Sequence, residues 1–315
     1  MTTPTPAATI EEQRHNVLTK QKVTSVPDAW DDLSSIPGAS TGHDIVPLTK
    51  NRIMLVGRGG SGKSTLINSD SRIAILDLEK GGRTVRQPRA IRFSPPPTTP
   101  FVHRAQYCRD VVKKLVTRKK SGKDDIQMLG IDTIDSLIHA FALEMMNREK
   151  ITDPGDYGGG HGKGYAVLRN DIMDNILGPV TQAGMGWVII CHITPIKIRA
   201  GEGDKLVNEL SMSQSFRGAF FKECDHFLAM ENTKVVDKKS RQAVTAKQIL
   251  CTPGGTWANG AIPDVKVRVP IKARIVLPIN DPFAALEKEY NLACEKLVEE
   301  YDDSSTSSTG STDEG

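Results

Sequence analysis

The feature that most limits the fold of this chain is a short glycine-rich segment, Gly57-Arg58-Gly59-Gly60-Ser61-Gly62-Lys63-Ser64-Thr65. It fits the pattern G-x-x-x-x-G-K-[ST], with an apolar run before it and a helix-compatible run after it. Glycines let the backbone curl so that successive N–H groups face a phosphate, and the helix N-terminus adds its positive end. The segment therefore predicts a nucleotide site in which Lys63 reaches the β- and γ-phosphates and the Ser64 hydroxyl coordinates Mg²⁺.

Beyond this segment, apolar runs of strand length alternate with longer runs of helical periodicity. We expect strands over 52–56, 72–78, 126–131, 187–193 and 226–230, and helices from about 63 and over 104–119, 134–149 and 165–176. This alternation is typical of an α/β fold with a mostly parallel sheet flanked by helices. Short β segments over about 233–280 predict an antiparallel extension, and a terminal amphipathic helix is expected over about 282–301.

These elements predict one domain over residues 46–301. Residues 1–45, rich in Thr, Pro, Ser and Ala, are expected to form a disordered arm, and residues 302–315 a disordered acidic tail. The apolar runs are shorter than the roughly 20 residues of a membrane span, and no secretory signal is visible. Five scattered cysteines with no C-x-x-C pair indicate neither a disulfide framework nor a zinc site. We therefore expect a cytoplasmic protein with no membrane partner.

The charge of the chain is concentrated in one block. The net charge is only +3, yet residues 80–123 contain thirteen Lys and Arg and one acid, Asp110. Such a block favours a polyanionic partner, because its contacts with a phosphate backbone would not depend on base sequence. A solvated helix face is the alternative interpretation.

Two of the predicted strands end in acids, and a third ends in histidine. Asp132 follows the run 128–131 and is the better candidate for the second Mg²⁺ ligand, with a helix N-cap as the alternative. The run 75–79 is the competing strand. Its Glu79 is our candidate for positioning or deprotonating the attacking water, unless it is a plain surface acid. His192 closes the strand 187–192 and could sense the γ-phosphate, although a lone histidine at a strand end is more often structural.

In this order, the motifs G-x-x-G-S-G-K-S-T, L-D-L-E-x-G-G, I-D-T-x-D and a strand closing on C-H resemble the RecA-like core. They are most similar to the phage ATPases of the Sak-type single-strand annealing group. The resemblance covers about residues 50–280, and only the P-loop motif is specific by itself. It implies ATP and Mg²⁺ as cofactors, with Asp132 as the Walker B acid. It also implies that Glu79 activates water and that His192 takes the polar sensor position.

The resemblance further implies how such a protein assembles and what it binds. Lys272 and Arg274 resemble the basic pair that reaches a neighbouring subunit's ATP site in RecA-like assemblies, so a homo-oligomer, ring or filament, is expected; a basic surface strand is the alternative. Single-stranded DNA would bind at mobile loops, for which 153–164 and 194–208 are the candidates. A single-strand-binding protein is a further conceivable partner. The segment 83–100 has no counterpart in the family pattern.

Other functions remain open at this point. A small-molecule kinase would use the same P-loop, with an arginine-rich lid formed by Arg83, Arg86, Arg89 and Arg92. A nucleotide-dependent scaffold would not need Glu79, and a helicase-like motor would share the core. A GTPase is less favoured, because Asn232-Thr-Lys-Val-Val-Asp237 places its acid one residue too far for the base-reading motif. The sequence does not distinguish annealing from strand exchange or unwinding, nor ATP from other nucleotides.

Overall fold

The computed structural model describes residues 45–79, 88–123, 125–200, 203–236, 241–251, 256–257, 260–261 and 267–306. All of them belong to one unit, Ile45–Gly315. The arm predicted over residues 1–45 lies outside the described residues except for its last position, as does the tail from residue 307 onward. Within the described residues, no helix is both long enough and apolar enough to span a membrane.

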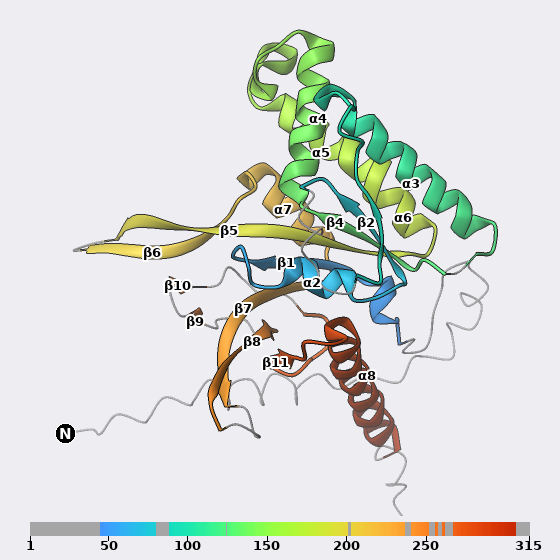
Figure 1. Cartoon of the computed structure of the whole chain (residues 1–315), viewed down its shortest axis with the longest axis vertical. Coiled ribbons are helices and arrows are strands. Elements are labelled where there is room, and N and C mark those ends of the chain that lie inside the picture. The colour runs from blue at the N-terminus through green and yellow to red at the C-terminus, as the bar shows by residue number, and fades with distance from the viewer. Residues whose placement is uncertain are drawn as a thin grey trace, which may run out of the picture. The chain divides into compact units, whose positions relative to one another are not determined.

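In the described part of the chain, nine strands form one sheet between two layers of helices (Figure 1). The strands are β1 (Arg52–Gly57), β2 (Ile73–Asp77), β3 (Ile91–Phe93), β4 (Met128–Asp132), β5 (Gly186–Ala200), β6 (Gly203–Leu210), β7 (His226–Val236), β8 (Ala243–Leu250) and β11 (Arg274–Leu277). Their order is β11-β8-β7-β1-β5-β4-β2-β3, with β6 paired to β5 off this path. The run from β7 to β3 is parallel, whereas β8, β11 and β6 pair antiparallel. A separate pair joins β9 (Thr256–Trp257) and β10 (Gly260–Ala261).

Helices cover both faces of this sheet. They are α2 (Lys63–Asn68), α3 (Arg104–Lys120), α4 (Ile134–Glu149), α5 (Lys163–Ile172), α6 (Gly178–Gln182), α7 (Gln214–Glu223) and α8 (Pro282–Thr306). The described residues also form short helical turns: η2 (Leu48–Lys50), η4 (Phe101–His103), η5 (Pro154–Gly159) and the π-helical η6 (Met173–Leu177). The predicted α/β class, with its C-terminal antiparallel strands and terminal helix, is confirmed.

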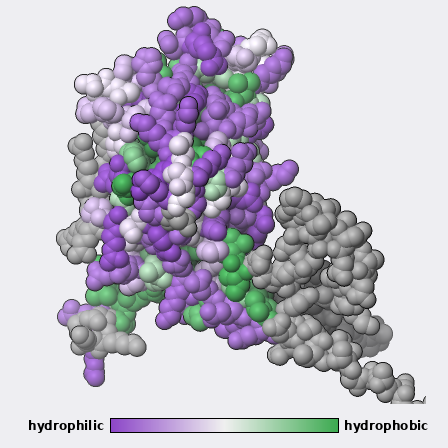
Figure 2. Space-filling model, turned by 90° about the vertical axis from the view of Figure 1, so that its right-hand side faces the viewer, coloured by the Kyte–Doolittle hydropathy of each residue, from purple (hydrophilic) through white to green (hydrophobic). Residues whose placement is uncertain are grey.

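The central strands are buried on both faces because their side chains alternate between two cores. On β1, Met54 and Val56 join the core beneath α3 to α7, whereas Ile53 and Leu55 join the core beneath α2 and α8. This continuous apolar burial is what a parallel sheet covered on both sides requires. The outer surface is correspondingly polar: hydrophilic side chains dominate the side of the molecule seen in Figure 2, with a few hydrophobic ones gathered lower down.

The segment 194–208, predicted as a mobile loop, is a β-hairpin instead. Strand β5 continues past His192 to Ala200, and β6 pairs with it from Gly203 to Leu210. The hairpin projects away from the sheet in Figure 1. Pro195, Gly201 and Gly203 hid this continuation, yet Pro195 is tolerated because it lies where β5 has only β6 as its partner.

Further expectations need correction. The loop predicted over 153–164 contains the turn η5, and α5 begins inside it at Lys163. Within the antiparallel extension expected over about 233–280, residues 267–269 are not a strand, and 265–266 lie outside the described residues. Helix α8 continues to Thr306, into the predicted tail, because nothing in Asp302–Thr306 breaks a helix as Pro or Gly would. Strand β3 was not expected either; it is only three residues long and pairs with β2.

The core beneath α2 and α8 contains Phe283 of α8, which is 1% exposed. Phe283→Ala should lower the free energy of unfolding by about 3–5 kcal/mol, the usual cost of removing a fully buried phenylalanine. Leu292→Ala is the matched control on the same helix, because Leu292 is 41% exposed and should change stability by less than about 1 kcal/mol. Urea unfolding of both variants measures the difference. Equal effects would show that α8 is not docked on the sheet.

Candidate nucleotide-binding site

The glycine-rich segment connects β1 to α2 at the C-terminal edge of the parallel strands. A side chain at Gly57 would place its Cβ 2.3 Å from the Met230 carbonyl oxygen on β7, so only glycine fits there. Gly62 has a φ of 100°, a left-handed conformation that glycine adopts without strain. The sequence pattern therefore corresponds to a physical need for glycine at both ends of the turn.

Lys63 is folded into this turn and is only 4% exposed. Its Nζ donates to the carbonyl oxygens of Gly57, at 2.6 Å, and Arg58, at 3.0 Å. Burial lowers the pKa of Lys63 to about 8, although the nearby carboxylates of Asp132 and Glu79 oppose this shift. The ammonium is thus held at the loop, where incoming phosphate oxygens would replace carbonyl oxygens as its acceptors.

Asp132 ends β4 beside the start of α2 and is 4% exposed. Burial raises the pKa of its carboxyl, and a hydrogen bond from the Ser64 side chain opposes that rise. A hydroxyl and a carboxylate in contact are oxygen ligands of the kind that Mg²⁺ takes alongside nucleotide phosphates. The described residues contain no cluster of three or more His, Cys, Asp or Glu side chains suited to a metal. The pair therefore fits Mg²⁺ held jointly with a nucleotide rather than a metal bound by protein ligands alone.

The competing acid, Asp77, has a different environment. It is 1% exposed and forms an ion pair with Arg92 on the neighbouring strand β3. Its carboxylate is thus already occupied by a cation, whereas Asp132 faces Ser64. Of the two candidate strands, β4 is the one that brings its acid to the glycine-rich segment.

Glu79 lies just beyond the end of β2, between two neighbouring strand ends. Its Oε1 accepts hydrogen bonds from Thr133 Oγ1, at 2.6 Å, and Ser136 Oγ, at 3.1 Å. Its Oε2 lies 3.6 Å from His192 Nε2. The Glu79 side chain is 39% exposed, so water can reach it.

His192 links Glu79 to the lysine. It pairs directly with Gly57 in the register of β5 with β1, and its Nδ1 lies 3.4 Å from Lys63 Nζ. One imidazole ring therefore contacts both charged groups. Lys63, Glu79 and His192 are far apart in the sequence, and the adjacent C-terminal ends of the parallel strands bring them together.

The predicted basic pair is not part of this constellation. Arg274 begins β11, three strands away from β1 in the sheet, and Lys272 precedes it in the chain. Both side chains are exposed. At about 4.8 Å between neighbouring strands, they lie on the order of 14 Å from β1, outside the chain's own glycine-rich segment.

The sequence did not predict the side chains that contact the glycine-rich loop and Glu79. Lys247 on β8 donates to the Gly60 carbonyl oxygen at 2.5 Å and also to Asn232 on β7. If Gly62 had a side chain, its Cβ would lie 3.2 Å from Lys247 Cγ, so the Lys247 side chain of β8 packs directly against the glycine-rich loop. No motif marks Lys247. Thr133 and Ser136 had a signal, because both fall in the stretch directly after the strand that ends in Asp132.

The lowered pKa of Lys63 makes the free energy of unfolding depend on pH. Below about pH 8 the amine is charged in the folded and the unfolded chain, and its burial lowers stability. Between about pH 8 and the ordinary lysine pKa of 10.5 the folded chain has already lost the proton, so stability should rise by about 3 kcal/mol. Lys63→Met keeps the length without the charge. It should be more stable than the wild type at pH 7 and lose that advantage toward pH 10.5 in urea unfolding; a constant difference would contradict the prediction.

Comparison with known families agrees with this geometry. A family model described as an AAA domain matches residues 49–252, which include the glycine-rich segment and the strand ends that carry Glu79, Asp132 and His192. A search of curated proteins found no match. Because the matched region covers more than half of the chain, the chain belongs to the AAA domain family, in agreement with a nucleotide-binding P-loop ATPase fold.

Proposed function

We propose that this protein is a Mg²⁺-dependent ATPase that acts on single-stranded DNA, similar to the Sak-type phage ATPases in recombination, annealing or replication. The observation that carries the proposal is the position of His192. It contacts Lys63 and Glu79 at the phosphate site, and it belongs to the strand that continues outward as the β5–β6 hairpin. A polymer bound at the hairpin would thus act on the same strand that senses the nucleotide.

The roles of the site residues follow from their positions. Lys63 would bind the β- and γ-phosphates, and Ser64 with Asp132 would hold Mg²⁺. Bound Mg²⁺ supplies positive charge that neutralises the phosphate oxygens as the bond to the γ-phosphate breaks. Glu79, which is 39% exposed and forms no ion pair with a described Arg or Lys, would orient the attacking water and accept its proton.

A kinase with an arginine-rich lid is less well supported. Arg89 forms an ion pair with Asp281, and Arg92 forms one with Asp77. Arginines held by acids of the same chain are poor candidates for a lid that closes on phosphates. Arg83 and Arg86 lie outside the described residues.

The DNA-binding surface would combine the hairpin with the basic helix α3. The sequence of the hairpin contains Lys197, Arg199 and Lys205. On α3, Lys113 and Lys114 are exposed. Contacts of this kind are made with the phosphate backbone and weaken as salt rises.

The experiment that tests the proposal is the ATP hydrolysis rate with and without poly(dT), at low and high salt. We expect stimulation by DNA that decreases with salt, and loss of turnover in Lys63→Ala, which lacks the phosphate-binding amine. An ATPase rate that poly(dT) leaves unchanged at both salt concentrations would reject the DNA-dependent function. Normal turnover in Lys63→Ala would reject the site.

Glu79→Gln tests the water-activating role separately. The amide keeps the shape of the side chain but is a far weaker base, so kcat should fall by about 10²- to 10⁴-fold. ATP binding, measured by calorimetry, should be retained because Glu79 does not contact the P-loop backbone. Glu287→Gln is a matched control, since Glu287 pairs with Arg72 far from the phosphate site. Hydrolysis at the wild-type rate in Glu79→Gln would exclude this role.

The basic pair is proposed to act on a neighbouring subunit, because it cannot reach its own P-loop. Lys272→Ala with Arg274→Ala should lower turnover by about 10³-fold or more, as loss of an arginine finger does. Mixing this variant with Glu79→Gln should restore part of the activity, since some interfaces then combine an intact site with an intact basic pair. Absence of any recovery in an assembled mixture would place the pair outside the mechanism.

A further inference from the structure

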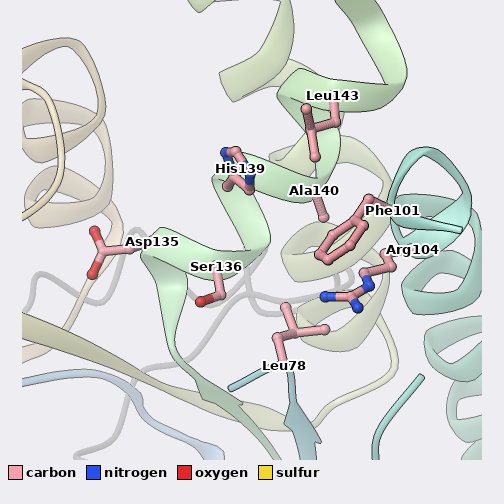
Figure 3. A pocket seen from close by; sticks show the side chains of 8 residues that line it. All are labelled: Leu78, Phe101, Arg104, Asp135, Ser136, His139, Ala140 and Leu143. Atoms are coloured by element: carbon pink, nitrogen blue, oxygen red, sulfur yellow. The ribbon is translucent and has the colours of Figure 1, made fainter. Parts of the chain in front are cut away.

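A cavity of about 230 Å³ lies beside the candidate ATP site, between the first turns of α3 and α4. Figure 3 shows the side chains that line it, with Leu78 below, Phe101 and Arg104 on one side and His139 with Leu143 above. Ser136 lies at its edge, and the same Ser136 hydroxyl donates to Glu79 at 3.1 Å. The cavity and the proposed catalytic acid thus share one hydroxyl group.

Arg104 has unused hydrogen-bonding capacity in this cavity. Its guanidinium stacks on the Phe101 ring, 3.9 Å from the centroid, and points inward in Figure 3. Its Nε is buried and has no hydrogen-bond partner, and no described carboxylate forms an ion pair with it. Phe101 itself is 59% exposed, which is unusual for so large an apolar side chain.

The size and the lining favour a planar, partly apolar ligand. The volume is below the roughly 300–1,000 Å³ of pockets for drug-sized molecules, so it suits one ring system better than a whole nucleotide. Aromatic rings and guanidinium planes are the usual stacking surfaces for unpaired bases, whose edges then bond to polar side chains. Arg104, Ser136 and His139 supply such groups here. A free phosphate fits less well, because it would be buried against Leu78, Ala140 and Leu143.

We infer that this cavity binds one base of a DNA single strand and that Ser136 couples its occupancy to Glu79. The inference rests on the proposed DNA-dependent ATPase function and adds a binding site to it. The strand backbone would continue along α3, where Lys113 and Lys114 are exposed. A base that hydrogen-bonds to Ser136 competes with Glu79 for that hydroxyl, which leaves Glu79 Oε1 with the hydrogen bond from Thr133 alone and freer to turn toward the attacking water.

The test compares oligo(dT) with an abasic oligonucleotide of equal length, which has the same backbone charge and no bases. Wild type should bind oligo(dT) more tightly. Phe101→Ala and Arg104→Gln should each reduce that preference by about 5- to 100-fold, the loss expected for one stacked base. Lys113→Gln is the control on the same helix: it should weaken both oligonucleotides equally and reduce the salt slope by about 0.7.

Ser136→Ala tests the coupling, with Ser136 as a positioning residue. Loss of the hydroxyl should weaken oligo(dT) binding by no more than the one hydrogen bond to the base, leave the KM for ATP unchanged and lower the ratio of DNA-stimulated to basal kcat, because Glu79 is then free of Ser136 with or without DNA. A merely structural role would lower the melting temperature and leave that ratio unchanged. An unchanged stimulation ratio would overturn the coupling.

The outcomes separate this inference from the proposed function. DNA stimulation in the wild type together with wild-type base preference in Phe101→Ala and Arg104→Gln would overturn the base site alone. No stimulation and no DNA binding in the wild type would overturn both. Equal binding of the two oligonucleotides, with loss of self-association in Phe101→Ala, would assign the cavity to a second copy of this chain and overturn the base site.

Discussion

The arrangement at the site depends on one buried charge, the ammonium of Lys63. It lies at the end of the central strand with 4% of the residue exposed, and such burial is unfavourable unless acceptors surround the charge. The carbonyl oxygens of Gly57 and Arg58 provide them, which requires the loop to curl tightly. The close approach of Gly57 to the backbone at Met230 then limits what can stand at the start of that loop.

The parallel strands bring the remaining groups to this charge. Strands β1, β5, β4 and β2 are neighbours, and their C-terminal ends meet at one edge of the sheet. His192 on β5 lies next to Gly57, while Asp132 ends β4 and Glu79 lies just beyond the end of β2. Residues more than a hundred positions apart in the chain are thereby placed within hydrogen-bonding distance. This edge is where open α/β sheets bind ligands.

Two hydrophobic cores, one on each face of the sheet, stabilise the strands that form this edge. The helices α3 to α7 pack on one face of the sheet, and α2 with α8 pack on the other. The antiparallel strands β8 and β11 extend the sheet beyond β7, and β8 places Lys247 on the crest of the loop. The C-terminal extension is therefore part of the phosphate site and not an appendage to it.

Much of the fold could be predicted from the sequence, because its signals are local. The glycines of the loop, the apolar strands and α4 over Ile134–Glu149 all depend on neighbours in the chain, through backbone freedom and side-chain periodicity. The candidates came from local signals too: Lys63 from the glycine-rich motif, and Asp132, Glu79 and His192 as polar residues at the ends of apolar runs.

Only the tertiary structure decided which of these residues touch. Strand order and register decide three of these contacts. Asp77 pairs with Arg92, and Lys247 binds the glycine-rich loop at Gly60. The Ser136 hydroxyl donates to Glu79 and also lines the cavity. The β5–β6 hairpin was also hidden, since its strands pair residues that are distant in the chain, such as Ile193 with Leu210, in a segment interrupted by Pro195, Gly201 and Gly203. Pairing and packing are contacts between distant segments, and a one-dimensional pattern does not contain their distances.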